Sequence, residues 1–280
     1  MLRFFSFITI TLLFVGLANA QKTFKVTIHL DSSVNPQRIR CQYYNGKNVV
    51  ILPDTFANKT LLRFSDNYYS PLASFEIDYV DGSRTTYNSN FFIGEKSAAI
   101  TLYFEPNKEF KLRYRALSNA TPIFDTTANK TWARLNTFMT DTVIKKENQA
   151  FDAFLAKNPN FNKNDSTRRI FNGFYKSHLN RAMAFLKKHP NDYFSFWYFI
   201  QQIAQPEGVL SNDTAYLKVQ LSYITSVFPA KFTNSAEGEA LMEKYAKKYK
   251  LMLDTVPPPF TITTIDGTTL ARLNLGVNMC

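Results

Sequence analysis

The spacing of apolar residues changes its period once along this chain, and that change constrains the fold more than any other feature. From Thr23 to about Ala116, apolar and polar residues alternate, as they do in half-buried β-strands. After the segment from Asn119 to Pro122, apolar residues recur every three or four positions, the spacing of a helix with one buried face. The sequence therefore predicts an α+β protein whose β-rich part precedes an all-helical part.

The β-rich part, residues 21–118, is expected to form an antiparallel β-sandwich or an open barrel. Its first strand places Phe24, Val26, Ile28 and Leu30 on one face. Further strands are predicted at residues 38–44, 49–52, 61–64, 72–80, 84–92, 98–104 and 109–115. The breaks include Asn45-Gly46, Asp81-Gly82 and Gly94-Glu95, which suit turns that need positive φ. Many short strands with no helical period between them are typical of such folds.

The helical part is predicted over residues 119–255. Residues 132–157 fit one long or two short helices that end at Asn158-Pro159. Asp165, Ser166 and Thr167 are expected to cap the next helix, which ends at His189-Pro190. The stretch from Asn191 to Ala204 is apolar nearly all round, so it is predicted to be the buried central helix, capped by Asn191 or Asp192. Two more helices are expected, one from Asp213 or Thr214 to Pro229 and one that begins near Ser235.

Charge and cysteine content restrict the partners and the compartment. The chain has 33 Lys and Arg against 22 Asp and Glu, a net charge of +11. Its basic pairs lie among helix-spaced apolar residues, as on solvated helix faces, and no nucleic-acid-binding module accompanies them, so no nucleic-acid partner is expected. The two cysteines, Cys41 and Cys280, are not expected to pair, because Cys41 lies in a strand-like run that favours a buried thiol.

Residues 1–20 have the pattern of a secretory signal peptide. An apolar run from Phe4 to Leu17 is followed by Ala18-Asn19-Ala20, a small-x-small cleavage site. We expect cleavage after Ala20 and export to the periplasm or the outer face of the cell envelope, with membrane contact only through this signal. An uncleaved N-terminal anchor is the alternative.

No residue is singled out as catalytic, cofactor-binding or metal-binding. The sequence has no Gly-x-Ser-x-Gly, no phosphate-binding glycine loop, no His-Glu-x-x-His and no Cys-x-x-Cys. His29 is expected on the exposed face of the first strand, and Glu76 and Asp78 on an exposed strand face. The aromatic pairs Tyr43-Tyr44, Tyr68-Tyr69 and Phe91-Phe92 are each expected to hold one core and one surface residue.

The last part, residues 256–280, predicts a proline connector followed by a strand, an Asp266-Gly267 turn and a second strand. The pattern P-x-F-x-I-x-x-x-D-G covers residues 258–267, K-x-H-P-x-x-Y covers 187–193, and S-x-E-G covers 235–238. With these motifs the chain resembles exported Bacteroidota proteins of the TlpA and peroxiredoxin type, in which a β-rich domain precedes a thioredoxin-like domain. The resemblance implies that residues 256–280 form the incomplete start of such a domain, truncated before its Cys-x-x-Cys.

Three functions remain open on this basis. The first is a non-catalytic accessory or interaction region of a thioredoxin-like protein, whose partner is an unknown protein. The second is the front part of a thiol-disulfide oxidoreductase. The third is a secreted glycan-binding or adhesion protein that uses exposed aromatic residues of the β-rich part.

Overall fold

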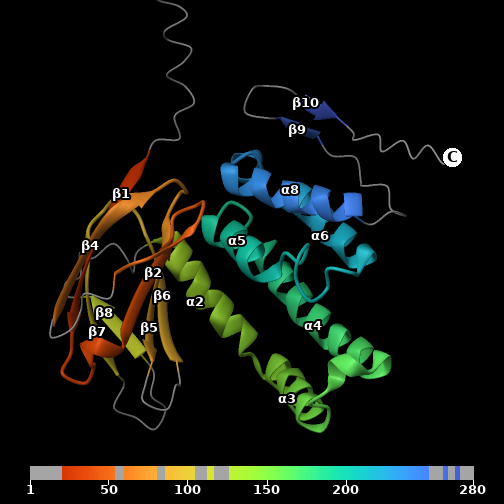
Figure 1. Ribbon diagram of the computed structural model, residues 1–280, viewed down its shortest axis with the longest axis horizontal. Helices are drawn as coiled ribbons and strands as arrows, with labels where there is room; N and C mark the ends of the chain where they lie inside the picture. Colours follow the sequence, from red (N-terminus) through yellow and green to blue (C-terminus); the bar gives the residue numbers. More distant parts are fainter. Residues whose placement is uncertain are drawn as a thin grey trace, which may run out of the picture. The chain divides into compact units, whose positions relative to one another are not determined.

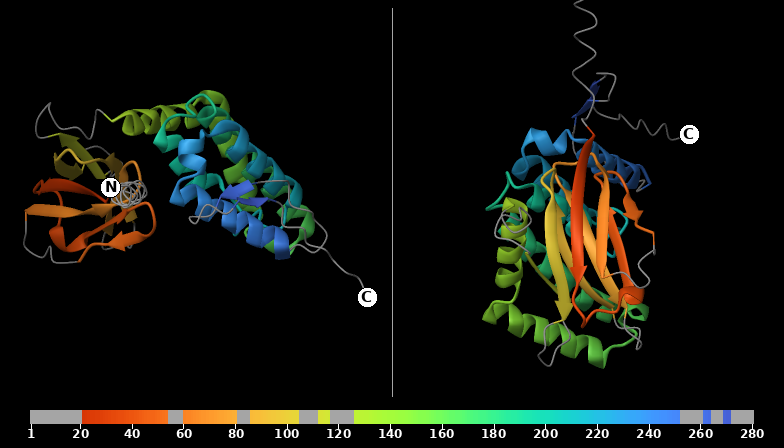
Figure 2. Two further views of the ribbon diagram at one scale, coloured as in Figure 1. Left: turned by 90° about the horizontal axis from the view of Figure 1, so that it is seen from above. Right: turned by 90° about the vertical axis from the view of Figure 1, so that its left-hand side faces the viewer.

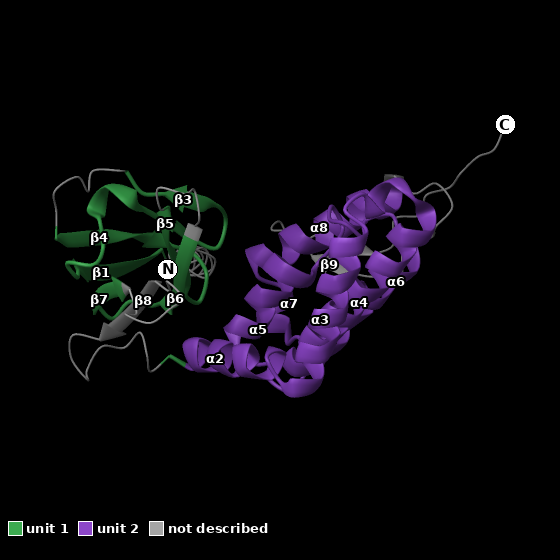
Figure 3. Ribbon diagram, turned by 90° about the horizontal axis from the view of Figure 1, so that it is seen from below, with its two compact units in different colours: residues 1–126 green, residues 127–280 purple. Residues whose placement is uncertain are grey.

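The computed structural model describes residues 21–53, 60–80, 86–104, 112–116, 126–251, 261–263 and 269–271. The protein is mixed α+β and divides into two compact units, residues 1–126 and 127–280 (Figure 3). The predicted boundary after residue 118 lies outside the described residues. The predicted signal peptide, the proline connector and Cys280 lie outside them as well.

Unit 1 contains two four-stranded sheets, visible as two layers in Figure 1 and Figure 2. One has the order β4-β1-β7-β8 and the other β3-β2-β5-β6, and neither closes into a barrel among the described strands. The strands are β1 (Lys22–Leu30), β2 (Ile39–Tyr44), β3 (Val49–Ile51), β4 (Leu61–Tyr68), β5 (Ala73–Val80), β6 (Thr86–Ile93), β7 (Ala98–Phe104) and β8 (Leu112–Ala116), and a short 3-10 helix, η1 (Pro36–Arg38), precedes β2. Every predicted strand is therefore present, and β4 is longer than predicted.

One strand pair departs from the predicted antiparallel arrangement. β1 pairs with β4 in antiparallel orientation, but it pairs with β7 in parallel, with Val26 opposite Ala98 and Leu30 opposite Leu102. Alternation of apolar residues reports which face of a strand is buried, and it is the same for both orientations. The sequence pattern could not have revealed this pair.

The two sheets of unit 1 bury a common apolar core. Phe24 of β1 lies 4.9 Å from Tyr43 of β2 and 5.9 Å from Phe75 of β5, measured between ring centroids. These residues belong to one buried cluster to which strands of both sheets contribute. The alternation predicted for the first strand is confirmed, since Phe24, Val26, Ile28 and Leu30 are all buried.

The turn between β2 and β3 depends on a glycine. Gly46 has φ +93°, and a Cβ built on it would lie 2.7 Å from the backbone nitrogen of Ser70. The Asn45 side chain accepts hydrogen bonds from the backbone N–H groups of Lys47 and Asn48, at 2.9 and 2.8 Å. Gly94, which was also expected to take positive φ, does not do so.

Unit 2 is built from helices, followed by a short hairpin. The elements are α2 (Thr127–Met139), α3 (Thr142–Lys157), η3 (Phe161–Lys163), α4 (Asp165–Leu186), α5 (Tyr193–Tyr198), η4 (Phe199–Ile203), α6 (Thr214–Val227), α7 (Ala230–Thr233), α8 (Ala236–Leu251), β9 (Thr261–Thr263) and β10 (Thr269–Ala271). Asp141 caps α3, so residues 127–157 form two helices and not one long helix. In the described part of the chain, no helix combines the length and the apolar character needed to cross a bilayer.

The predicted central helix is confirmed, and it has an unpredicted second half. Asp192 caps α5, and Phe194, Phe196 and Phe199 are fully buried. Residues 199–203 continue as the π-helical turn η4. The ring of Phe196 stacks on Phe232 of α7 at 5.2 Å, and that of Phe199 stacks on Tyr223 of α6, also at 5.2 Å.

A buried amide joins the end of η4 to two other helices. Gln220 of α6 has no exposed surface. Its Nε2 donates to the carbonyl oxygen of Ile203 at 2.8 Å, and its Oε1 accepts from the backbone N–H of Gln205 and from the hydroxyl of Tyr245 of α8, at 3.0 and 2.7 Å. The wide turn of η4 therefore ends on hydrogen-bond partners outside its own helix.

The strands predicted near the end of the chain are paired. β9 and β10 run antiparallel, with Ile262 opposite Leu270. The expected turn residues Asp266 and Gly267 lie outside the described residues. The pairing is that of a hairpin, as predicted.

Two glycine-to-alanine substitutions are predicted to have opposite effects. Gly46→Ala should destabilise unit 1 by about 1–3 kcal/mol, because positive φ and the nearby Ser70 backbone both disfavour a Cβ. Gly173→Ala, in the middle of α4, should stabilise by about 0.5–1 kcal/mol, because the added Cβ would meet no atom within 4 Å apart from its chain neighbours and the backbone of its own helix. Urea unfolding of each variant measures both, and equal effects of one sign would contradict the prediction.

The stability contributed by Asp213 is predicted to depend on pH. Asp213 caps α6, accepts from the Tyr216 N–H at 3.0 Å and forms an ion pair with Lys176 of α4. Burial alone would raise the pKa of this carboxyl, but the bonds from Lys176 and Tyr216 outweigh it and hold the pKa below its ordinary value. A lowered folded-state pKa stabilises above the unfolded pKa of about 3.9, and this stabilisation is lost as the pH falls through the folded value.

Asp213→Asn keeps a capping side chain but removes the charge. We expect it to cost about 0.5–1 kcal/mol at pH 7, with the difference from the wild type shrinking below about pH 4. Urea unfolding of both proteins at pH 7 and pH 3 gives the two differences. A difference that stays constant between these pH values would assign the effect to the cap alone.

Candidate functional site

A cavity of about 380 Å³ lies between α3 and α4 within unit 2. The two helices run antiparallel, because contacts at the start of one match contacts at the end of the other: Glu147 pairs with Arg181, and Phe151 with Phe174. Its lining residues are Glu147, Asn148, Phe151 and Asp152 from α3, and Phe174, Tyr175, Ser177, His178 and Arg181 from α4. The cavity thus has aromatic walls and a charged rim.

An aromatic cluster holds α3, η3 and α4 together beside the cavity. Phe151 lies 5.5 Å from Phe171 and 5.3 Å from Phe174, between ring centroids. Phe161 of η3 stacks on Phe171 at 4.2 Å, and Phe171 stacks on Tyr175 at 5.9 Å. Aromatic pairs at these distances stabilise the packing of the helices by more than their buried area alone.

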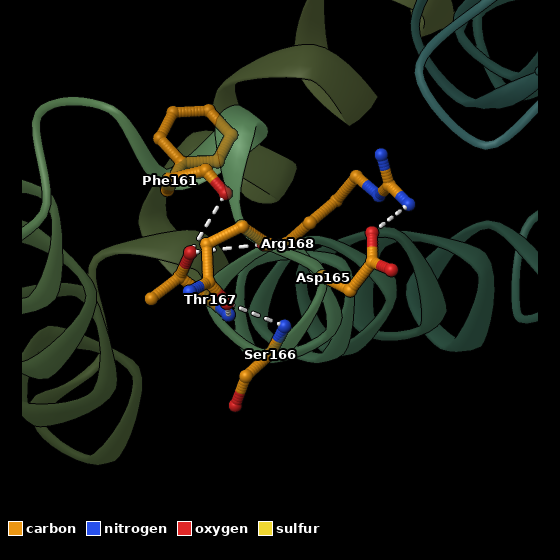
Figure 4. Close-up of polar contacts among 6 residues, drawn as sticks. Phe161, Asp165, Ser166, Thr167 and Arg168 are labelled. Atoms are coloured by element: carbon orange, nitrogen blue, oxygen red, sulfur yellow. Dashed lines mark hydrogen bonds and ion pairs between the residues drawn. The ribbon is translucent and has the colours of Figure 1, made fainter.

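The start of α4 is set by a network of side-chain bonds shown in Figure 4. The Oδ1 of Asn164 accepts from the N–H groups of Ser166 and Thr167, at 2.8 and 3.3 Å. The Thr167 hydroxyl donates to the Phe161 carbonyl at 2.8 Å, and Arg168 pairs with Asp165 at 2.5 Å. The predicted cap within residues 165–167 is therefore wrong by one residue. Asn164 is the cap because its extended backbone lets the amide oxygen reach back to the first free N–H groups.

The rim of the cavity carries charges of both signs. Arg181 of α4 forms an ion pair with Glu147 of α3. Among the described residues, none forms an ion pair or a hydrogen bond with the Asp152 carboxylate, which is exposed. The rim therefore carries two carboxylates, Glu147 and Asp152, and one guanidinium, Arg181.

Two polar rings complete the lining. His178 is exposed on its outer side, yet the surrounding protein removes enough water from the ring to lower its pKa below the ordinary value, which favours the neutral imidazole at pH 7. The Tyr175 hydroxyl accepts from Nε2 of Gln205 at 3.3 Å, which links the cavity wall to the Gln220 amide. The cavity can offer aromatic faces, carboxylate acceptors and one hydroxyl to a bound group.

The histidines and Cys41, which were considered from the sequence, do not come together into one site among the described residues. His29 is exposed on β1 as predicted, while His178 and His189 lie in unit 2. The described ranges contain no group of three or more His, Cys, Asp or Glu that could hold a metal ion. Cys41 is a buried strand residue at 1% exposure, as predicted.

Two expectations about surface residues of unit 1 are wrong. Glu76 and Asp78 are half-buried instead of exposed; Glu76 accepts from Gln42 at 2.7 Å, and burial together with the Glu76 charge raises the pKa of Asp78. Phe91 and Phe92 are both fully buried, so this pair contributes no surface residue. Face alternation holds for Tyr68 and Tyr69, of which only Tyr69 is exposed.

Two of the sequence motifs meet in the structure. The Tyr193 hydroxyl, from K-x-H-P-x-x-Y, donates to Oε1 of Glu237, from S-x-E-G, at 2.8 Å in the interior. Ser235 accepts from the Gly238 N–H at 3.3 Å, and a Cβ on Gly238 would lie 2.4 Å from the carbonyl oxygen of Thr233. These motif residues hold α5 and α8 together.

The α3–α4 cavity was not foreseen in the sequence. Its residues belong to two helices that the sequence does predict, but the helical pattern does not show which of their side chains line a cavity. The available signal was an acidic residue, Glu147, on one helix and a basic residue, Arg181, on the next, the two that form an ion pair. That signal becomes specific only once the antiparallel register is known.

The cap of α4 gives a test of this local architecture. Asn164→Ala should cost about 1 kcal/mol of unfolding free energy, because two backbone N–H groups lose their acceptor. Asn162→Ala, two residues earlier and exposed, is the matched control and should change stability by less than about 0.5 kcal/mol. Chemical unfolding of the two variants compares them, and equal costs would show that Asn164 does not act as the cap.

Comparison of the chain with protein-family models, with curated proteins and with solved structures finds no match in any of the three.

Proposed function

We propose that this chain is an exported, non-catalytic interaction region of a thioredoxin-like protein of the TlpA type, which binds a protein partner through the α3–α4 cavity. The observation that carries the binding role is the cavity itself, about 380 Å³ in volume, in a unit where other aromatic residues, such as Phe196 and Phe199, are packed against aromatic partners. A concave site with apolar walls and a few polar groups is the usual form of a binding pocket.

The architectural part of the proposal is a β-sandwich followed by a helical region and a thioredoxin-like hairpin. It is supported by the common core of the two sheets, by the helices of unit 2 and by the β9–β10 pairing. Export is supported by the pattern of residues 1–20. The assignment to the TlpA type rests on the three sequence motifs.

The alternative that the chain is the front part of a thiol-disulfide oxidoreductase is supported by the same hairpin. Insulin reduction by the purified chain would contradict the non-catalytic role. The glycan-binding hypothesis is not favoured, because Tyr43, Tyr68, Phe91 and Phe92 are buried and leave only Tyr44 and Tyr69 of its aromatic platform at all accessible.

The binding role is tested by filling the cavity. Ser177 lines it, so Ser177→Phe should occupy the space and abolish retention of an envelope protein that the wild-type chain captures. Ala184→Phe adds the same side chain at an exposed position of α4 and should leave retention unchanged. Affinity capture from envelope extract, quantified by mass spectrometry for the three proteins in parallel, gives the comparison. Equal retention by all three would remove the cavity from the function.

A further inference from the structure

We propose that the α3–α4 cavity binds an organic cation, an ammonium or guanidinium group carried on an apolar stem. This rests on the proposed function in taking the cavity as a binding site, and it adds the chemical class of the group that enters. The inference follows from the aromatic walls of the cavity, from the charges at its rim, and from the ion pair that already engages Arg181.

The walls suit a cation with a hydrocarbon stem. Phe151, Phe174 and Tyr175 are half-buried and line the space. The faces of aromatic rings attract an ammonium or guanidinium group, more strongly where water is excluded, and they also cover methylene groups. This chain already makes such contacts, with Lys47 Nζ 4.0 Å from the ring centre of Tyr69 and Lys176 Nζ 5.4 Å from that of Tyr216.

The charges at the rim are unbalanced in the direction that a cation requires. Glu147 and Asp152 supply two negative charges and Arg181 one positive charge, while the lowered pKa of His178 keeps its ring neutral near pH 7. The rim therefore carries a local excess of one negative charge in a chain whose net charge is +11. One monovalent cation restores the balance.

The position of Arg181 disfavours the opposite ligand. Its guanidinium is already held by Glu147 across the two helices, so an anion would have to displace that carboxylate and approach Asp152 as well. The Asp152 carboxylate, in contrast, has no ion pair within the described residues and needs no rearrangement to receive a cation.

The test is an NMR titration of the full chain, followed at the backbone amides of α3 and α4. The probes share a stem and differ in the head group: n-butylammonium, n-butanol and butanoate. We expect butylammonium to shift resonances of α3 and α4, butanol to bind at least ~5-fold more weakly, and butanoate to give no saturable shift. Tighter binding of butanol or butanoate than of butylammonium would overturn the inference.

A second pair of ligands identifies the source of the cation. The peptide Ac-Gly-Lys-Gly-NH2 presents the ammonium on a protein side chain, and the same peptide with norleucine is its neutral match. Preferential binding of the lysine peptide supports a protein side chain as the natural occupant. Binding of butylammonium without the lysine peptide supports the cation site with a free amine as its source.

Matched variants connect the binding to Asp152. Asp152→Asn should weaken butylammonium binding ~5-fold or more, and Asp152→Glu should largely retain it. Asp165→Asn makes the same change in net charge at the exposed start of α4, outside the cavity lining, and should have no effect. Equal effects of Asp152→Asn and Asp165→Asn would overturn the inference by showing that only the overall charge matters.

The outcome also separates this inference from the proposed function. If Ser177→Phe abolishes partner retention while no cation binds, the interaction role stands and the cation assignment is wrong. If butylammonium binds but retention is insensitive to Ser177→Phe, the cation site stands and the cavity is not the partner site.

Discussion

The helical unit depends on the hydrogen bonds of one buried amide. Gln220 lies in the interior, where an unpaired amide would cost a few kcal/mol, about the size of the whole contribution of a well-packed side chain. Its oxygen and nitrogen close the end of the π-helical turn and reach the Tyr245 hydroxyl. Because three helices meet at this group, the wide turn of η4 is compatible with a close-packed centre. Gln205, whose backbone N–H donates to Gln220, also donates from its side chain to the Tyr175 hydroxyl, so these hydrogen bonds extend to the cavity wall.

The cavity follows from how charge and aromatic packing are divided along α3 and α4. Where both helices present phenylalanine, the rings meet and fill the space between them. Towards the start of α3, Glu147 faces Arg181, and a partly exposed ion pair keeps its charged ends near water. The helices therefore enclose a space between a packed end and a hydrated end. One end of the cavity is therefore apolar, where phenylalanine rings separate the helices, and the other is charged, where the Glu147–Arg181 ion pair does so.

The sequence predicted the elements well and their connections less well. The alternation around Phe24 and the apolar run at residues 193–203 are strong predictors because each pattern reflects burial directly. The predicted buried strand face and the predicted buried helix are both confirmed. The cap at Asn164, displaced by one residue, depended on backbone angles that several neighbouring polar residues could have adopted. The parallel pairing of β1 and β7 and the cavity could not be predicted, since both depend on which distant segments meet. No residue of the candidate site was singled out, because each has an equally good role on an ordinary helix face.

The parallel pair also imposes an order on the assembly of unit 1. The sheet β3-β2-β5-β6 uses strands that lie between residues 39 and 93, mostly joined to their neighbours in sequence. β1, by contrast, forms part of its pairing with residues 98–102, some seventy positions later. As the chain emerges from synthesis, β1 can pair with β4 but must wait for β7 before its second edge is covered. Loop closure over such a distance is slow compared with hairpin formation. During that interval the exposed edge of the first strand is the part of unit 1 most open to a chaperone or to pairing with another chain.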